Sequence, residues 1–370
     1  MTKFINNIIS FFTYINFLLL SLFFRKNNKA VRNDILFINT GQIGDLTVSS
    51  MIFDNDDFFN DNTNVYFLMK EHYRELFTNY TGKVKILTYD YNKYKWNIFY
   101  RIKLLKKLNR LNINSVYNIT AARGILNDEI TLLSGAKEKY TICNNHKYLG
   151  GFFGEKMDIK YDDILFQNER NEYKKHITLL KLFFNKEPAL INTKSFDVSN
   201  FSDFISNKGY EAGKYIVISP LASEIIKTWG IDNYKKLCSH LSKKYKIILN
   251  GSESEKKYLQ YISEGLDNTF VETFKLEILP ALIAYSKLFI GNDSGATHIA
   301  LKLNVPLIAI LFGGNFNMFF PFKENEKKFV FLYNILDCFE CESGCIYDKP
   351  LCLTQITLEQ VMEKIGNILS

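Results

Sequence analysis

From residue 34 onward, the chain alternates between short apolar runs and longer segments in which apolar residues recur every three or four positions. A short apolar run predicts a buried strand, and the longer pattern predicts an amphipathic helix. Strands and helices in alternation form βαβ units, which build a parallel sheet covered by helices. In the first half we predict strands at Asp34–Asn39, Asn64–Met69, Lys83–Leu87 and Asn114–Ile119, and helices at Gly44–Phe53, Trp96–Leu108 and Gly124–Leu133. This pattern limits the fold to the α/β class.

The alternation is interrupted between Gly150 and Phe201 and then starts again. In the second half we predict strands at Lys214–Pro220, Lys246–Asn250, Lys287–Ile290 and Pro306–Phe312, and a last helix that begins near Thr357. Two series of βαβ units joined by an irregular stretch predict two Rossmann-like domains that face each other across a cleft. We place the first domain at residues 33–190, the second at 191–356 and the terminal helix at 357–370.

The composition is that of a globular protein. Of the 370 residues, 47% are hydrophobic and 23% are charged, which excludes a disordered chain, a collagen-like chain or a coiled coil as the main architecture. The formal charge of +7 is a mild bias that suits acidic partners such as phosphates or anionic lipid. Without a basic motif, this charge does not indicate a nucleic-acid partner.

The N-terminal segment, residues 1–32, is hydrophobic and ends in a basic flank. The run Phe4–Phe24 contains no charged residue, and about 20 apolar residues suffice to span a bilayer. The cations within Arg25–Arg32 follow the run, which would keep the rest of the chain on the cytoplasmic side. Asparagine amides within the run oppose full insertion. We expect membrane association, as a span or as an interfacial helix; the alternative is a helix that packs on the protein itself.

The segment Ile38–Ser50 joins the first predicted strand to a helix. Gly41 and Gly44 allow a tight turn, and Asp45 then lies near the start of the helix, at the carboxyl end of the first strand. Ligands of open parallel sheets bind at this edge. Asp45 is therefore a candidate catalytic residue; the alternative is an N-capping aspartate without a chemical role. The segment is neither a P-loop nor a dinucleotide-binding glycine motif.

A second polar loop follows the strand predicted at Lys287–Ile290. Asp293, Ser294 and Gly295 lead into a helix, where small residues and free backbone N–H groups suit a phosphate. His298 lies one turn further and could donate to the same phosphate, and Asp293 could fix the loop or bind a ligand hydroxyl. The alternative is a satisfied turn followed by a histidine that faces the core.

Two other strand ends also carry polar residues. Ser223 and Lys227 follow the strand that ends near Pro220, and a lysine there suits a diphosphate as a point charge. The alternative is a solvated lysine in a loop. Glu253 and Glu255 follow the next strand, where a carboxylate can bind ribose hydroxyls or simply favour the start of a helix.

Together these motifs resemble those of glycosyltransferase family 9, the bacterial heptosyltransferases that extend the lipopolysaccharide inner core. The family's G-x-x-G-D motif is similar to Gly41–Asp45, and its D-[TS]-G-x-x-H motif is similar to Asp293–His298. Lys227 and Trp229 match its K-x-W motif, and Glu255 matches a glutamate that follows a strand-end glycine. The resemblance covers residues 34–370.

The resemblance implies a GT-B fold in which the C-terminal domain binds an ADP-sugar and the N-terminal domain binds the acceptor. Asp45 would be the general base for the acceptor hydroxyl, which would attack the anomeric carbon with inversion. The residues implied for the ADP-sugar are Ser223, Lys227, Glu255, Asp293, Ser294, Gly295 and His298. Glu255 would hold the ribose, and cationic and polar groups would stabilise the leaving diphosphate. No metal takes part in this transfer, and residues 357–369 would return to pack on the N-terminal domain.

Four of the six cysteines lie close together near the C-terminus, at Cys338, Cys341, Cys345 and Cys352. Thiolates at this spacing suit a tetrahedral structural metal ion. The resemblance adds that related autotransporter heptosyltransferases bind iron through a similar four-cysteine finger. We predict a structural zinc or iron ion; the alternative is free thiols on a loop.

The resulting expectation is an inverting transferase that moves a sugar, heptose by family default, from an ADP-sugar to a lipopolysaccharide-core or related lipid-linked saccharide. It would act at the cytoplasmic side of the bacterial inner membrane. One alternative is a protein O-heptosyltransferase of the autotransporter type, which the cysteines favour. The other is a non-catalytic nucleotide-sugar-binding protein in a saccharide assembly complex, against which Asp45 and the intact phosphate loop argue.

Overall fold

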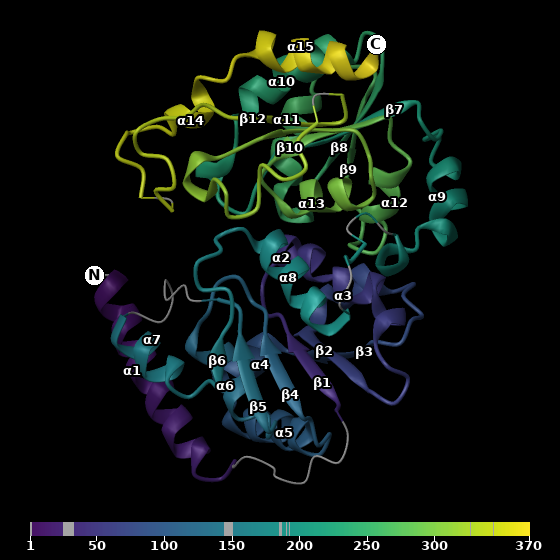
Figure 1. Ribbon diagram of the computed structural model, residues 1–370. Coiled ribbons are helices and arrows are strands. Elements are labelled where there is room, and N and C mark those ends of the chain that lie inside the picture. The colour runs from purple at the N-terminus through teal and green to yellow at the C-terminus, as the bar shows by residue number, and fades with distance from the viewer. Residues whose placement is uncertain are drawn as a thin grey trace. The chain divides into compact units, whose positions relative to one another are not determined.

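The computed structural model describes residues 2–24, 33–143, 151–184, 187–189, 191, 193–325, 327–342 and 344–370 (Figure 1). The chain forms two compact units. The first contains Met1–Arg74 and Thr81–Pro188, and the second contains Glu75–Tyr80 and Ala189–Ser370. Each unit is built on one six-stranded sheet in which the paired strands run parallel. The predicted α/β class with two parallel-sheet domains is therefore confirmed.

The first sheet has the strand order β3-β2-β1-β4-β5-β6. Its strands are β1 (Ile35–Ile38), β2 (Val65–Lys70), β3 (Lys85–Tyr89), β4 (Ser115–Asn118), β5 (Glu138–Thr141) and β6 (Asp163–Ile164). The central strand β1 is buried along its whole length, with Ile35 in register with Val65 on one side and Ser115 on the other. Its continuous apolar sequence fits a strand that is covered on both faces.

Helices precede, connect and follow these strands in the first unit. They are α1 (Thr2–Ser21), α2 (Ile43–Ser49), α3 (Met51–Asp54), α4 (Tyr91–Trp96), α5 (Ile98–Asn109), α6 (Ile125–Leu132), α7 (Gly151–Asp158) and α8 (Glu172–Phe184). The helix predicted at Trp96–Leu108 begins two residues later than expected. Asn97 ends α4 and caps α5, because its side chain accepts a hydrogen bond from Tyr100 N (3.1 Å).

The second sheet has the order β12-β11-β10-β7-β8-β9. Its strands are β7 (Tyr215–Ser219), β8 (Lys246–Asn250), β9 (Thr269–Glu272), β10 (Leu288–Asn292), β11 (Leu307–Ile310) and β12 (Phe329–Leu332). Its helices are α9 (Ser202–Asn207), α10 (Ile231–Leu241), α11 (Lys256–Ser263), α12 (Leu279–Ala284), α13 (Gly295–Lys302), α14 (Leu351–Thr354) and α15 (Leu358–Leu369). Central strands β7 and β10 are fully buried and pair in register, with Ile218 opposite Ile290.

The terminal helix α15 starts where its sequence predicts and packs elsewhere than expected. Thr357 and Gln360 form the predicted capping box, with Thr357 N donating to Gln360 Oε1 (2.8 Å). We expected residues 357–369 to return to the N-terminal domain. In the structure, Val361 and Ile365 are instead buried in the core of the second unit, and the helix contacts α10 and β11. The apolar stripe of α15 is satisfied there.

Helix α1 packs on the first unit through one face. Phe17 and Leu20 are buried in a cluster with Leu105 of α5 and Leu132 and Leu133 at the end of α6. The opposite face is apolar and exposed, at Phe11, Phe12, Leu18 and Leu19. Within the described part of the chain, no helix combines the length and apolarity needed to cross a bilayer. The basic flank expected within Arg25–Arg32 lies outside the described residues.

Candidate functional site

Asp45 lies at the carboxyl edge of the first sheet, where the chain leaves β1 and enters α2. The strand-end residue Asn39 holds this turn: its Oδ1 accepts a hydrogen bond from Gly41 N (2.8 Å) and its Nδ2 donates to Asp45 O (3.2 Å). A Cβ atom on Gly41 would lie 2.5 Å from the Asp45 side chain. Position 41 must therefore be glycine for the carboxyl group to occupy this place.

The Asp45 carboxyl group caps α2 and also titrates abnormally. Its Oδ2 accepts a hydrogen bond from Gln42 N (2.8 Å), as part of a capping box. Burial raises the pKa of Asp45, while the Gln42 N–H group and the charge of Lys70 oppose the rise. The capping role and the predicted catalytic role thus concern the same side chain. A carboxylate with a raised pKa is the stronger general base.

Lys70 and Tyr73 also lie at this edge of the sheet, and no sequence motif pointed to them. Lys70 ends β2, the strand beside β1, and its Nζ lies 5.0 Å from the ring centroid of Tyr91 and 6.0 Å from that of Tyr73. Burial lowers the pKa of Lys70, and the negative charge of Asp45 counteracts this effect. The Tyr73 hydroxyl donates to Gln42 Oε1. Position at the end of the neighbouring strand is the sequence signal that would have identified Lys70.

Glu172 is a second carboxyl group on the Asp45 side of the first unit. It is the first residue of α8, a helix that contacts α2, and it is buried. Its Oε1 accepts from Lys175 Nζ (2.9 Å), while its Oε2 is buried without a hydrogen-bond partner. Burial raises the pKa of Glu172 to about 7 despite Lys175, and the charge of Asp45 adds to the rise. Near neutral pH this group can hold a proton beside Asp45.

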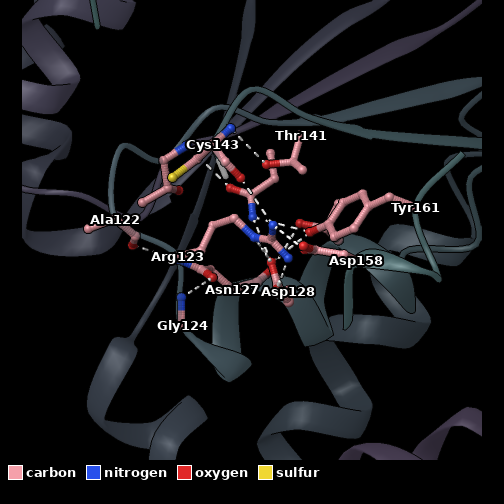
Figure 2. A network of polar contacts seen from close by, with 12 residues as sticks. Ala122, Arg123, Gly124, Asn127, Asp128, Thr141, Cys143, Asp158 and Tyr161 are labelled. Atoms are coloured by element: carbon pink, nitrogen blue, oxygen red, sulfur yellow. Dashed lines mark hydrogen bonds and ion pairs between the residues drawn. The ribbon is translucent and has the colours of Figure 1, made fainter. Parts of the chain in front are cut away.

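A buried ion network supports the turn before Asp45 from the next strand (Figure 2). Arg123 binds Asp128 through two bonds, Nε to Oδ1 (3.0 Å) and Nη2 to Oδ2 (2.8 Å), and its Nη1 donates to Asp158 Oδ1 (2.6 Å). This network fixes the loop between β4 and α6. From that loop, Thr120 Oγ1 accepts from Thr40 N (3.0 Å), so the loop also anchors the residue before Gly41.

The phosphate loop predicted in the second unit joins β10 to α13. Ser294 is the N-cap of α13, with extended backbone (φ −148°, ψ 167°), and its Oγ is buried without a hydrogen-bond partner. The helix starts at Gly295, and the N–H groups of a first helical turn have no partner within the helix. An orphaned hydroxyl beside such a helix end is suited to a phosphate oxygen.

Asp293 and Lys227 are brought together beside this loop. Burial raises the pKa of Asp293 to about 6, while the Lys227 charge and a hydrogen bond with the Asn315 side chain oppose the rise. Lys227 has only 14% of its side chain exposed, and its Nζ pairs with Glu224 Oε1 at 2.6 Å. Glu224 is 52% exposed, so an incoming diphosphate can take its place as the partner of Lys227.

Asn292, the last residue of β10, binds both ends of the connection between β7 and α10 and also binds α10 itself; no prediction from the sequence gave it this role. Its Oδ1 accepts from Trp229 N (3.0 Å) and from the Tyr234 hydroxyl (3.0 Å), and its Nδ2 donates to Pro220 O (2.8 Å). These bonds hold the segment that carries Lys227 against the segment that carries Asp293. Trp229 itself is a packing residue, since it is buried and its indole N–H donates to Ile356 O (2.8 Å).

His298 occupies an apolar position. Its ring is stacked on Phe320 with centroids 4.4 Å apart and meets Phe319 edge-on at 5.1 Å. Burial lowers its pKa to about 3, so the ring is neutral at physiological pH. The surroundings favour the core-facing alternative over the charged phosphate donor that the motif suggested.

Glu255 and Ser223 also lie at the carboxyl edge of the second sheet. Glu255 Oε2 accepts from Ser252 N and Ser252 Oγ, each at 2.7 Å, which makes it a capping residue after β8. Glu253 is bound to Lys256 Nζ (2.8 Å) and Thr273 Oγ1 (2.6 Å). Ser223 is exposed in the loop after β7. A ribose role for Glu255 stays a prediction.

The structure does not support the predicted metal site in the cysteine loop. Among the side chains that the structure describes, no group of three or more His, Cys, Asp or Glu residues is placed to hold a metal ion. Zinc or iron at Cys338, Cys341, Cys345 and Cys352 is therefore unsupported. The loop instead braces Gly313–Asn315, with Glu340 N donating to Gly313 O (2.8 Å) and Glu342 N donating to Gly314 O (3.1 Å).

The fold of the two units and the polar side chains at their sheet edges indicate the class of protein. Each is a parallel α/β unit with polar side chains at its carboxyl edge: a perturbed carboxyl group in the first unit, and a helix N-terminus with a lysine and an orphaned hydroxyl in the second. Such an arrangement is typical of enzymes that bind a phosphate-containing ligand on one domain and a second substrate on the other.

Sequence comparison narrows this class to one family. Residues 168–348 match the family model for glycosyltransferase family 9 (heptosyltransferase). Over 123 residues the chain is 32% identical to lipopolysaccharide heptosyltransferase 3 of Escherichia coli K12, covering 31% of this chain and 36% of that protein. Over 317 residues it is 24% identical to lipopolysaccharide heptosyltransferase 1 of Campylobacter coli, covering 80% and 88%. These matches confirm the resemblance to glycosyltransferase family 9 that the motifs predicted.

The E. coli match spans about a third of that relative's length. Solved structures agree on the fold. E. coli heptosyltransferase WaaC with ADP superposes with a TM-score of 0.67 at 14% identity, covering 90% of this chain and 99% of that one. The iron-containing dodecameric glycosyltransferase TibC of enterotoxigenic E. coli gives a TM-score of 0.53 at 14% identity, covering 93% and 77%.

Proposed function

We propose that this chain is an inverting glycosyltransferase that moves a heptose from ADP-heptose to a lipopolysaccharide-core or related lipid-linked saccharide. The names of its relatives support the reaction class, and a structural neighbour solved with ADP-2-deoxy-2-fluoro heptose supports the donor. The observation that carries the proposal is the Asp45 carboxyl group, fixed at the sheet edge by Gly41 and Gln42, with a pKa raised by burial.

In this proposal Asp45 takes the proton of the acceptor hydroxyl as that oxygen attacks the anomeric carbon. The bond from the sugar to the diphosphate breaks, and ADP leaves with its added negative charge. Lys227, the Ser294 hydroxyl and the N-terminus of α13 supply the positive charge and hydrogen bonds that stabilise this leaving group. Glu255 binds the ribose, and Ser223 and Asp293 border the diphosphate.

We further propose that the protein works at the cytoplasmic side of the bacterial inner membrane, where a lipid-linked acceptor resides. The outward face of α1, with Phe11, Phe12 and Leu19 exposed, supports a contact with the bilayer surface.

The test of the reaction is ADP release from ADP-heptose in the presence of lipopolysaccharide-core acceptor. We expect Asp45→Asn to lower kcat by at least about 100-fold, since the general base is lost, while calorimetric binding of ADP-heptose is retained. Asp90→Asn is the matched control, because Asp90 caps α4 after β3 on the same sheet and has no assigned role in transfer. Full activity of Asp45→Asn would refute the mechanism.

A further inference from the structure

The junction of α4 and α5 exposes large aromatic side chains. Trp96, the last residue of α4, is 73% exposed, and Phe99, in the first turn of α5, is 81% exposed. Ile98 between them is 40% exposed. Single exposed apolar residues are common, whereas adjacent exposed aromatics mark a surface that meets a partner.

A row of cations continues from these aromatics along α5. Lys103, Lys106 and Arg110 follow Phe99 at spacings of four, three and four residues, which places them on one face of the helix, and all are exposed. The opposite face, with Leu104, Leu105 and Leu108, is buried in the unit. With the residues that the structure describes, Lys103, Lys106, Lys107 and Arg110 form no ion pair. Their charge is therefore available to a partner.

Acidic residues are missing from this segment of the sequence. Residues 91–110 contain five lysines, two arginines and no aspartate or glutamate. Two of the cations are engaged elsewhere: Lys93 pairs with Asp90 (3.1 Å), and the buried Arg101 pairs with Glu129 (3.5 Å). Lys95 lies with its Nζ 4.7 Å from the Trp96 ring centroid, so cation and aromatic ring are presented together.

We propose that this surface, the α4–α5 ridge, binds the anionic surface of a lipid bilayer. The ridge consists of Lys95, Trp96, Ile98, Phe99, Lys103, Lys106, Lys107 and Arg110. Tryptophan and phenylalanine side chains insert at the level of the lipid headgroups, and lysines beside them meet lipid phosphates. A protein partner fits the ridge less well, because lysine is depleted from the cores of protein interfaces.

The Trp96 end of the ridge lies near the Asp45 edge of the same unit. Tyr91, the first residue of α4, has its ring 5.0 Å from Lys70 Nζ, and the charge of Lys70 acts on Asp45. Helix α4 runs from Tyr91 to Trp96, six residues with a total helix length of about 9 Å. A ridge seated on the bilayer would keep Asp45 near lipid-linked saccharides. This consequence rests on the proposed function, whereas the lipid contact itself does not.

The chain contains its own reporter for this contact. It has two tryptophans, Trp96 on the ridge and Trp229 in the core of the second unit, so acrylamide quenches mainly Trp96. With vesicles of phosphatidylglycerol and phosphatidylethanolamine, we expect the emission of the full-length protein to shift to shorter wavelength and its quenching to fall. Vesicles of phosphatidylcholine alone should give neither change. Binding to the anionic vesicles with unchanged Trp96 emission would overturn the proposal.

Substitutions test which positive charges the protein needs to bind anionic vesicles. We expect Lys103→Gln/Lys106→Gln/Arg110→Gln to weaken cosedimentation with anionic vesicles at least about tenfold. The control Lys208→Gln/Lys243→Gln/Lys257→Gln removes equal charge from exposed positions of the second unit and should bind normally. The variant Phe12→Ser/Leu19→Ser tests the apolar face of α1 separately. If this variant lost all vesicle binding while the ridge variant lost none, that result would also overturn the proposal. So would a Trp96 shift that depends on protein concentration without lipid, since this outcome assigns the ridge to self-association.

Activity on a delipidated acceptor saccharide separates this proposal from the proposed function. The ridge variants should retain ADP release with the soluble saccharide and lose it with acceptor embedded in vesicles. If the unaltered protein transfers no sugar at all, the proposed function fails. The vesicle experiments still decide whether the ridge binds anionic lipid.

Discussion

At the scale of single residues, the charge of Lys70 controls how readily Asp45 accepts a proton. Lys70 lowers the pKa of Asp45 against the effect of burial. In Lys70→Met the pKa of Asp45 should rise further, so the rising limb of the kcat/KM–pH profile should move to higher pH. Below the midpoint the variant would then be slower than the unaltered protein at the same pH. The measurement is the pH profile of ADP release.

The midpoint of this profile, rather than its plateau, is the informative quantity. A lysine that only contacts the acceptor would lower the plateau and leave the midpoint in place. Lys70→Arg keeps the charge and should keep the midpoint. A midpoint in Lys70→Met that is unchanged, or that moves to lower pH, would contradict the electrostatic role.

Ser294 gives a prediction in which stability and binding change in opposite directions. Its Oγ is buried without a partner and makes no capping bond to α13, so it costs free energy in the ligand-free protein. Ser294→Ala should therefore raise the free energy of unfolding by about 1 kcal/mol in urea titrations. It should also weaken ADP binding about tenfold in calorimetry, because a bond to a charged phosphate is lost. Ser294→Thr retains the hydroxyl group and should bind ADP; equal ADP affinity in Ser294→Ala would remove Ser294 from the site.

The candidate residues predicted from the sequence share one property: each follows a buried strand, in the loop or at the start of the helix after it. Asp45 follows β1 and Asp293 follows β10, and the carboxyl ends of parallel strands lie at one edge. Glu172 could not be predicted, since it reaches the Asp45 side only because α8 packs on α2. The environment of His298 depends on Phe319 and Phe320, which come from a later loop. Such contacts arise from packing between elements and leave no local pattern.

At the scale of elements, the loop between β4 and α6 depends on Arg123. The guanidinium group is fully buried between Asp128 and Asp158 and binds both. In Arg123→Met the buried Asp128 carboxylate would lose its charged partner, which typically costs about 3–5 kcal/mol. The urea midpoint should fall by a corresponding amount with an unchanged m-value. Arg110→Met, an exposed cation of the same unit, should change the free energy of unfolding by less than about 0.5 kcal/mol; a similar small effect of Arg123→Met would show that the network is dispensable.

The apolar pattern of the sequence identified central strands of both sheets. The strands predicted at Asp34–Asn39 and Lys214–Pro220 contain β1 and β7, which lie inside their sheets and are buried throughout. We did not predict β5, β6, β9 or β12; the last three lie at or beside sheet edges, whereas β5 pairs with both β4 and β6. Strand β6 has two residues, and β9 is partly exposed, so neither needs the continuous apolar run that marks a central strand.

At the scale of the whole molecule, the order of the sequence and the division into units differ at one place. Glu75–Tyr80 lies within the first half of the chain but belongs to the second unit. There Asn79 Nδ2 donates to Asp197 O (2.7 Å), and the Phe77 ring lies 5.5 Å from that of Phe196. No composition change marks this segment, although its apolar side chains are buried. The linear boundary predicted near residue 190 therefore omits it.

The assignment of Glu75–Tyr80 to the second unit leads to a prediction that the order of the sequence would not suggest. Phe77 is fully buried, and Phe196 against it is almost fully buried. Phe77→Ala should leave a cavity in the second unit and destabilise it by about 3–4 kcal/mol. In hydrogen exchange read by mass spectrometry, amides of β7 and β10 should lose protection while those of β1 and β4 keep it. Phe53→Ala provides the reciprocal control, since Phe53 is buried in the first unit with its ring 4.9 Å from Phe67. If Phe77→Ala instead exposed the amides of the first sheet alone, Glu75–Tyr80 would be energetically part of the first unit, and the two units would follow the order of the sequence.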